Sequence, residues 1–318
     1  MNHPRVSIVA PAYNEEQTLP AFYARVRDVM DDLGEPWELV LVNDGSSDRT
    51  GAVARDLHDE DPRVCLVDFA RNFGHQIAVT AGLDHARGDA VVIIDSDLQD
   101  PPEVIADMVA RWQEGYQVVY GVRSEREGET WFKLFTARLF YRIIGALTDV
   151  EIPMEAGDFR LLDRQVVDDL RRMRERRRMI RAMTSWVGYR QTGVTYHRQA
   201  RFAGETKYPF HKMFRFALDG VTGFSDVPLR LAWMCGLGLL GVGVVVGLVL
   251  LAIRLGGGAP LAGQGTMITL ALLLSGTQLI FLGILGEYLA RIYDEVRNRP
   301  LYTVRALLGF DDEKEDDD

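Results

Sequence analysis

The sequence predicts an α/β fold built on a mostly parallel sheet, followed by a pair of membrane-spanning helices. Along the first hundred residues, short apolar runs alternate with helical stretches, an order that produces parallel strands joined by right-handed crossovers. Further on, residues 231–253 and 266–286 form uncharged runs of 23 and 21 residues. Each run is long enough, as a helix, to cross a hydrocarbon core of roughly 30 Å.

The predicted strands are short runs rich in β-branched residues, and a polar turn follows most of them. We expect strands over residues 6–10, 38–42, 63–68, 90–94 and 118–120. We expect helices near residues 17–33, 49–59, 76–86 and 103–113. No Gly-x-Gly-x-x-Gly turn follows any of these predicted strands, and no Gly-x4-Gly-Lys-Ser/Thr loop is present, which disfavours dinucleotide binding and P-loop chemistry.

The charge and the cysteines limit the partners and the compartment. The formal net charge is −10, and seven of the eight residues 311–318 are acidic, so part of the imbalance is a solvated tail. This charge argues against a nucleic-acid partner. Cys65 lies in the polar half of the chain and Cys235 in an apolar run, so no disulfide framework is expected.

The most informative polar cluster follows the predicted strand 90–94. Asp95 and Asp97 leave the end of this strand on the same side, and Gln99 adds an amide oxygen two residues later. Open parallel sheets bind ligands beyond the carboxyl ends of their strands, which is where this cluster lies. The three side chains therefore predict a site for Mg²⁺ or Mn²⁺. The alternative is a solvated acidic turn that caps the following helix.

The two uncharged runs predict a transmembrane hairpin, because only the short segment 256–260 and its flanks separate them. Cations gather outside the pair, at Arg230, Arg291, Arg297 and Arg299. By the positive-inside rule, this distribution predicts a multi-pass inner-membrane protein whose large domain and C-terminus face the cytoplasm. Small residues could pack the helices within the hairpin or in a homo-oligomer; they are Gly236, Gly243 and Gly247.

This reading divides the chain into three parts. We expect a catalytic domain over residues 1–228, a hairpin over 229–290 and a cytoplasmic tail over 291–318. Residues 130–147 form an amphipathic stretch that predicts either a helix packed in the core or one lying on a membrane surface. Seven arginines between 171 and 181 predict a solvated helix face or a surface that attracts anionic lipid.

Several motifs, taken in order, resemble those of the inverting GT-A glycosyltransferases that use a polyprenyl phosphate as acceptor. Bacterial undecaprenyl-phosphate glucosyltransferases are the most similar members, and dolichyl-phosphate mannose synthases are relatives. The resemblance extends from Val6 to Tyr302. The motifs are Pro11-Ala12-Tyr13-Asn14-Glu15-Glu16, Val42-Asn43-Asp44-Gly45-Ser46, Arg71-Asn72-Phe73-Gly74-His75, residues 95–102, Gly157-Asp158-Phe159-Arg160, and Arg201 with Gly204-Glu205-Thr206-Lys207.

The resemblance assigns roles to individual residues. It implies that Asp97 and Gln99 bind the metal, with Asp95 between the metal and the nucleotide. The nucleotide-sugar donor would contact Pro11, Tyr13, Asn14, Glu15, Asp44, Asn72, Asp95 and Ser96. Ser96 stands where these relatives usually have Ala, and we expect its side chain to point away from the metal.

The resemblance also implies an acceptor site and a catalytic carboxylate. The acceptor phosphate would be held by Arg123, Lys133, Arg201 and Lys207, since guanidinium groups bind phosphate well. Asp158 and Asp97 stand as the catalytic residues. Asp158 matches the position of a general base, but it could instead orient the acceptor or hold a donor hydroxyl, because a phosphate monoester is already largely ionised at pH 7. His75 is more consistent with a structural role.

The implied reaction is transfer of glucose from UDP-glucose to undecaprenyl phosphate, with Mg²⁺ or Mn²⁺ and with inversion at C1. Other donors stay open, namely GDP-mannose or an aminoarabinose-type sugar. A processive polysaccharide synthase would need a Gln-x-x-Arg-Trp element, which is absent. A non-catalytic scaffold that binds sugar nucleotides is disfavoured because the acidic motifs are retained.

Overall fold

A computed structural model describes residues 3–123, 156–176, 178–197, 227–256 and 264–310. The chain forms two compact units, residues 1–209 with 299–318, and residues 210–298.

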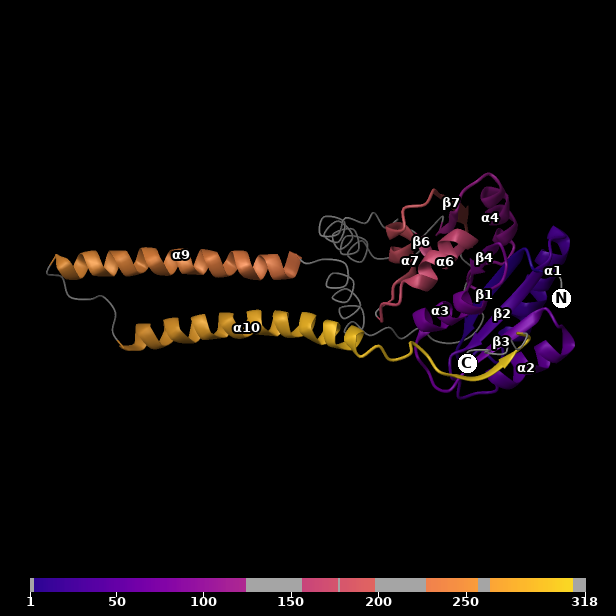
Figure 1. The fold of residues 1–318 in the computed structure, drawn as a ribbon, viewed down its shortest axis with the longest axis horizontal. Helices are drawn as coiled ribbons and strands as arrows, with labels where there is room; N and C mark the ends of the chain where they lie inside the picture. Colours follow the sequence, from indigo (N-terminus) through magenta and orange to yellow (C-terminus); the bar gives the residue numbers. More distant parts are fainter. Residues whose placement is uncertain (1–2, 124–155, 177, 198–226, 257–263, 311–318) are drawn as a thin grey trace, which may run out of the picture. The chain divides into compact units, whose positions relative to one another are not determined.

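The first unit is an α/β domain around a sheet of eight strands (Figure 1). The strands are β1 Val6–Ala12, β2 Trp37–Asn43, β3 Val64–Phe69, β4 Ala90–Ile93, β5 Val118–Arg123, β6 Ala156–Asp163, β7 Gln191–Tyr196 and β8 Val304–Leu308. Their order across the sheet is β7-β5-β6-β4-β1-β2-β3-β8. The helices are α1 Leu19–Leu33, α2 Thr50–Glu60, α3 His75–His85, α4 Val104–Gln113, α6 Arg164–Arg172 and α7 Ile180–Trp186.

The centre of the sheet is parallel, as the alternation of apolar runs and helices predicts. Strand β1 pairs in parallel with β2 and with β4, and β2 pairs in parallel with β3. Every residue of these four strands is buried. Continuous apolar runs of this kind are required where helices cover both faces of a sheet.

The flanks of the sheet correct the expectation of a mostly parallel arrangement. Strand β6 runs antiparallel to both β4 and β5, and β8 runs antiparallel to β3. The sheet is therefore mixed. Strand β8 lies within residues 291–318, the segment expected to be a tail.

Two layers of apolar side chains cover the two faces of the sheet. Because side chains alternate along a strand, Ile8 packs with α1, α2 and α4, whereas its neighbour Val9 packs with α3, α6 and α7. The two layers hold the strands rigidly, so that the loops at the carboxyl ends of β1, β2 and β4 are fixed relative to one another.

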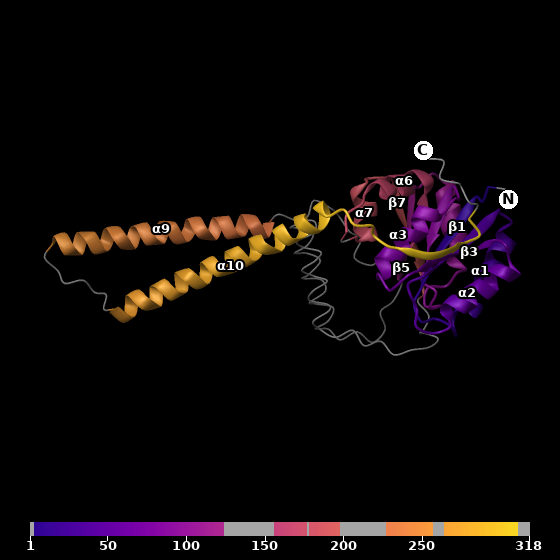
Figure 2. The same ribbon diagram turned by 60° about the horizontal axis from the view of Figure 1, so that its bottom comes forward.

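The second unit contains two long helices, α9 Val227–Leu255 and α10 Gln264–Val296 (Figure 2). Within the part of the chain that the structure describes, no helix is both long and apolar enough to cross a membrane. This finding corrects the predicted transmembrane hairpin and the predicted multi-pass inner-membrane location. The prediction counted uncharged residues along the sequence, whereas the described helices do not combine the length and apolarity that a span requires. The boundaries at residues 228 and 290 stay predictions.

Candidate active site

The loops after β1 and β2 are joined by hydrogen bonds. The Asn14 N–H donates to Ser46 Oγ over 3.0 Å, and the Ser47 N–H donates back to Asn14 Oδ1 over 2.9 Å. The Glu15 N–H donates to Thr50 Oγ1 over 2.8 Å. Asn14 adopts a left-handed conformation with φ of 57°, which asparagine tolerates better than most residues. The two loops therefore form one rigid unit, beside which Tyr13 is half exposed.

Asp44, at the end of β2, holds the loop that precedes α3. Its buried carboxylate accepts hydrogen bonds from the N–H groups of Phe73 and Gly74 at 2.7 and 3.0 Å, and from the Asn72 amide at 3.0 Å. Burial raises the pKa of Asp44, and the backbone hydrogen bonds offset this only in part. Gly45 lies so close to this loop that a Cβ there would be 2.3 Å from the Arg71 carbonyl carbon. The structure thus brings together Asp44 and Asn72, two residues predicted to bind the donor.

The acidic cluster follows β4 as the sequence predicts. Ser96 is buried and its hydroxyl donates to the Pro11 carbonyl over 3.0 Å, so this side chain is used to join β4 to β1. The Gln99 N–H donates to Asp97 Oδ1 over 3.0 Å, and Leu98 between them has a positive φ of 61°. Burial, together with the negative charges of Asp158, Asp97 and Asp100, outweighs the nearby histidine and raises the pKa of Asp95 to about 6.

A divalent cation would relieve this repulsion, and carboxylate and amide oxygens are its preferred ligands. In this respect Asp95, Asp97 and Gln99 fit a metal. Within the described ranges, no group of three or more His, Cys, Asp and Glu side chains is placed to hold a metal ion. The predicted set contains two carboxylates and one amide, so it stays a prediction.

His75, the first residue of α3, lies between two carboxylates from different strands. Its Nε2 is 3.4 Å from Asp158 Oδ2 and 3.7 Å from Asp95 Oδ1. Burial lowers the pKa of His75, but the hydrogen bond to Asp158 and the charges of Asp95, Asp158 and Asp44 raise it to about 9. His75 therefore carries a proton at neutral pH and links the ends of β4 and β6, a larger role than the sequence indicates.

Asp158 is ionised and partly unsatisfied. Burial raises its pKa, but His75, Arg181 and Arg160 together hold the pKa well below the usual range of a carboxyl group. Asp158 Oδ2 accepts a hydrogen bond from Gln76 Nε2 at 3.1 Å. Asp158 Oδ1 is buried, lies 3.8 Å from Arg181 Nε, and has no hydrogen-bond partner among the described residues. That atom therefore has an unused capacity to accept a hydrogen bond.

Arg123 reaches the same edge from the end of β5. Its guanidinium lies against Gly157, where an added Cβ would be 3.0 Å from Nη2. Its Nε donates to the Tyr196 hydroxyl over 3.4 Å, and that hydroxyl donates to Asp100 Oδ1. Of the four cations predicted to hold the acceptor phosphate, Arg123 is placed at the candidate site. The other three, Lys133, Arg201 and Lys207, lie outside the described residues, as does the amphipathic stretch 130–147.

The family is decided by the profile of glycosyl transferase family 2, which matches residues 7–171. The chain belongs to this family. The "Uncharacterized glycosyltransferase YkcC" of Bacillus subtilis is 48% identical over 312 residues, which cover 98% of this chain and 97% of that protein. The "Bactoprenol glucosyl transferase" of Shigella phage SfII is 40% identical over 301 residues, 95% of this chain and 97% of that protein. The predicted resemblance is confirmed, and the chain is a glycosyltransferase.

Three residues of this glycosyltransferase site carry weak sequence signals. Gln76 lies just after the Arg71–His75 motif, while Arg181 belongs to the arginine-rich segment and Tyr196 to a strand that the sequence does not predict. None of them stands in a recognisable motif. Their convergence depends on how α3, α7 and β7 are placed around β6.

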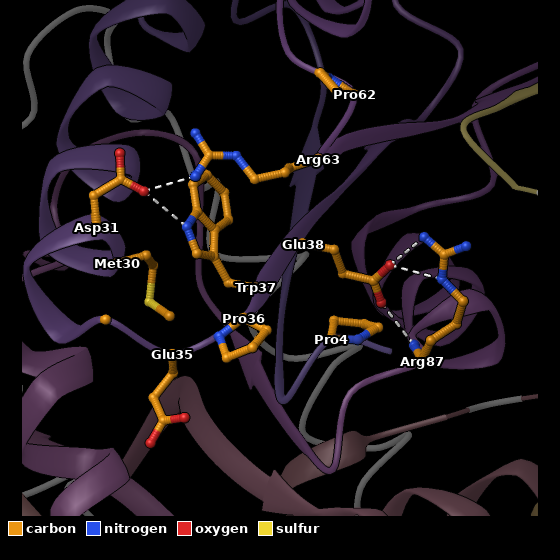
Figure 3. A pocket seen from close by; sticks show the side chains of 11 residues that line it. Pro4, Met30, Asp31, Glu35, Pro36, Trp37, Glu38, Pro62, Arg63 and Arg87 are labelled. Carbon is orange, nitrogen blue, oxygen red and sulfur yellow. Dashed lines mark hydrogen bonds and ion pairs between the residues drawn. The ribbon is translucent and has the colours of Figure 1, made fainter. Parts of the chain in front are cut away.

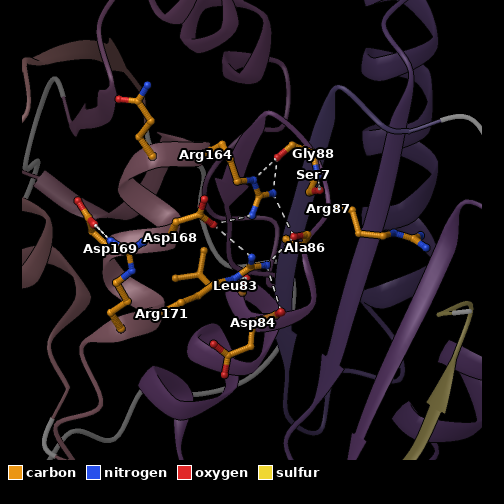
Figure 4. Close-up of polar contacts among 12 residues, drawn as sticks. Ser7, Leu83, Asp84, Ala86, Arg87, Gly88, Arg164, Asp168, Asp169 and Arg171 are labelled. Carbon is orange, nitrogen blue, oxygen red and sulfur yellow. Dashed lines mark hydrogen bonds and ion pairs between the residues drawn. The ribbon is translucent and has the colours of Figure 1, made fainter. Parts of the chain in front are cut away.

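The arginine-rich segment is not a single solvated helix face. Helix α6 ends at Arg172 and α7 begins at Ile180. Arg171 is half buried and donates to the carbonyls of Leu83 and Ala86 at 2.9 and 2.7 Å (Figure 4).

Arg164 donates to the carbonyl of Gly88 over 2.9 Å and to that of Ala86 over 3.0 Å (Figure 4). The last carbonyls of a helix have no partner within it, so these two arginines satisfy the C-terminal end of α3. They fix α6 against the helix whose other end carries His75.

Proposed function

We propose that this glycosyltransferase transfers glucose from UDP-glucose to a polyprenyl phosphate. The observation that carries the proposal is the relative from Shigella phage SfII, whose name states a bactoprenol glucosyl transferase and which matches 95% of the chain. The acidic edge of the sheet supports the proposal because it carries two kinds of side chain. Asp95, Asp97 and Gln99 suit a metal that binds a nucleotide diphosphate, and Arg123 is a cation suited to a phosphate acceptor.

In the proposed reaction, an oxygen of the acceptor phosphate attacks C1 of the sugar and UDP departs from the opposite face. A bond from C1 to the acceptor oxygen forms as the bond from C1 to the diphosphate breaks, so the configuration inverts. A divalent metal held by Asp95, Asp97 and Gln99 would neutralise charge on the diphosphate. The joined loops around Asn14 and Asp44 would hold the base and ribose, and Arg123 would contact the acceptor phosphate.

Asp158 has a different role in this proposal from that of a general base. A carboxylate whose pKa is held so low is a weak base, and the acceptor phosphate, with a second pKa near 6, is already largely ionised at pH 7. An ionised carboxylate also repels an anionic acceptor. We therefore assign the partly exposed Asp158 carboxylate to a hydroxyl group of the donor sugar.

The test is a panel of donors with one acceptor. Purified full-length protein is incubated with undecaprenyl phosphate and with radiolabelled UDP-glucose, UDP-galactose or GDP-mannose, and lipid-extractable label is counted. We expect label from UDP-glucose and a β-linked product. Preference for GDP-mannose would refute the donor, and the absence of a lipid product with every donor would refute the acceptor.

A further inference from the structure

Gln76 makes two hydrogen bonds that connect the Asp158 carboxylate to helix α7. It is the second residue of α3 and its side chain is half buried. Its Nε2 donates to Asp158 Oδ2 over 3.1 Å. Its Oε1 accepts from the N–H of Ile180, the first residue of α7, over 2.9 Å. One side chain of α3 therefore contacts both β6 and α7.

These two contacts require a carboxamide. Asp158 is ionised and can only accept, whereas the Ile180 N–H can only donate. A side chain between them must carry a donor and an acceptor on one planar group, which glutamine does and glutamate or methionine does not. Rotating the amide by half a turn would place oxygen against oxygen and N–H against N–H. The geometry therefore fixes the orientation of the Gln76 amide.

The links continue from α7 to the other side of Asp158. Arg181, the residue after Ile180, has its Nε 3.8 Å from Asp158 Oδ1. Thr184, also on α7, accepts from Arg160 Nη1 over 2.5 Å, and Arg160 donates from Nη2 to the Gly157 carbonyl. A displacement of α7 would move the cations that surround Asp158.

We propose that Gln76 is a positioning residue for glycosyl transfer. It restrains the Asp158 carboxylate through Oδ2, and it holds the start of α7 so that Arg181 stays beside Oδ1 of the same carboxylate. This inference rests on the role of Asp158 in the proposed function. The charged groups that face Gln76 and Asp158 are His75 on α3, Arg181 on α7 and Arg160 on β6.

The first test is Gln76→Met, which keeps the length of the side chain and removes both hydrogen bonds. We expect kcat to fall about tenfold, the scale of one hydrogen bond to a charged group, with KM for UDP-glucose within about twofold of the wild type. The matched control is Gln191→Met. Gln191 is also half buried and bonds the α7 backbone at the Thr184 carbonyl, but no hydrogen bond joins it to Asp158 among the described residues. We expect this control to keep kcat within about twofold.

The second variant, Gln76→Glu, separates positioning from a general loss of structure. The glutamate can still accept from Ile180, but when ionised it repels Asp158, and when protonated it regains a donor. The ratio of variant to wild-type kcat should therefore rise as the pH falls. Taking the ratio removes the titration of the acceptor phosphate, which both proteins share. A ratio that does not change with pH would overturn the inference.

A double-mutant cycle with Asp158→Asn completes the test. In the Asp158→Asn background, we expect Gln76→Met to change kcat by less than about twofold, because the group it positions is gone. The inference alone would be overturned if Asp158→Asn lowered kcat while Gln76→Met kept the wild-type kcat. It would also be overturned if the losses in kcat of the two single variants were fully additive in the double variant. A fully active Asp158→Asn would overturn the proposed role of Asp158 and the inference together.

Discussion

Two carboxylates at opposite ends of the same sheet, the buried Glu38 and the half-buried Asp158, have very different surroundings. Glu38, near the start of β2, accepts hydrogen bonds from the Arg87 N–H at 2.7 Å and from the Arg87 guanidinium at 2.6 Å (Figure 3). It also accepts one from the Ser7 hydroxyl at 2.6 Å. Asp158, near the carboxyl ends of the central strands, has one oxygen with no hydrogen-bond partner in the described residues. The first carboxylate is saturated and the second is not.

One cavity among the described residues lies beside the saturated carboxylate. It has a volume of about 570 Å³, and Trp37, Glu38, Arg63 and Arg87 line it (Figure 3). Its polar groups are engaged with one another. The Arg63 guanidinium lies 4.2 Å from the centre of the Trp37 ring and forms an ion pair with Asp31 over 2.7 Å. A cavity whose polar side chains are hydrogen-bonded to one another is typical of a structural feature. Crowded charged side chains that lack hydrogen-bond partners are typical of an active site.

The largest effect should come from the acidic cluster. We expect Asp97→Ala to abolish turnover, and chelation to silence the wild type until Mg²⁺ or Mn²⁺ is added, because uncompensated charge on the departing diphosphate would remain. Asp107→Ala, an exposed aspartate on α4, is the matched control and should keep full activity. Full turnover of the wild type in EDTA would contradict the metal site.

The two carboxylates can be compared directly by removing one charge from each. Asp158→Asn should lower kcat about ten- to a hundredfold, the value of a hydrogen bond from a sugar hydroxyl to a charged acceptor. Glu38→Gln should leave the kcat of the folded enzyme within about twofold. A loss of 10³-fold or more in Asp158→Asn would instead indicate a general base. Steady-state rates at saturating donor and acceptor make the comparison.

The free energy of unfolding should depend more on Glu38 than on Asp158, the reverse of the order expected for kcat. Glu38→Ala leaves the Arg87 guanidinium without its buried partner, and we expect a loss of about 3–5 kcal/mol in the free energy of unfolding. Urea unfolding followed by circular dichroism measures this. Arg5, whose carboxylate partner Glu35 is partly exposed, provides the control, since Arg5→Ala should cost less than about 1 kcal/mol. Equal losses in the two variants would refute the distinction between saturated and solvated pairs.

The smallest effect concerns Asp95 and has a defined pH dependence. The raised pKa, about 6 against 3.8, means that the folded state holds its proton more tightly than the unfolded state does. The associated stability is complete below pH 3.8 and is lost as the pH rises through 6. Asp95→Asn should therefore match the wild type near pH 4 and be more stable above pH 6, by about 1 kcal/mol once solvent screening is included. If Asp95→Asn were less stable than the wild type at pH 7 without metal, the ionised Asp95 carboxylate would not be destabilised by its surroundings, and the prediction would be wrong.

The central part of the fold could be predicted because its signals are local. Strands β1 to β4 are mainly apolar runs, and each is followed by a polar loop whose residues are adjacent in the sequence. Asp44 and Asp95 then lie along the same edge of the sheet, because the carboxyl ends of parallel strands share one edge. The grouping of the residues that we predict to bind the donor thus follows from the order of the strands alone.

The rest depends on pairings between distant segments. Nothing local in residues 156–163 indicates that β6 enters antiparallel between β4 and β5. That insertion is what brings Asp158 to His75 and Gln76. The transmembrane hairpin predicted from the uncharged runs was also wrong, because no described helix is long and apolar enough to cross a membrane.

The antiparallel strand β8 places a constraint on synthesis. It closes the outer edge of β3, and the contact between the Cys65 thiol and the Gly309 carbonyl beside this pairing joins residues 244 positions apart. A ribosome adds about 5–20 residues per second, so the edge of β3 waits about 10–50 seconds for its partner. During that interval each nascent chain presents an unpaired strand that can pair with a neighbouring chain. Slow or stalled translation after β3 would therefore favour aggregation over assembly of the sheet.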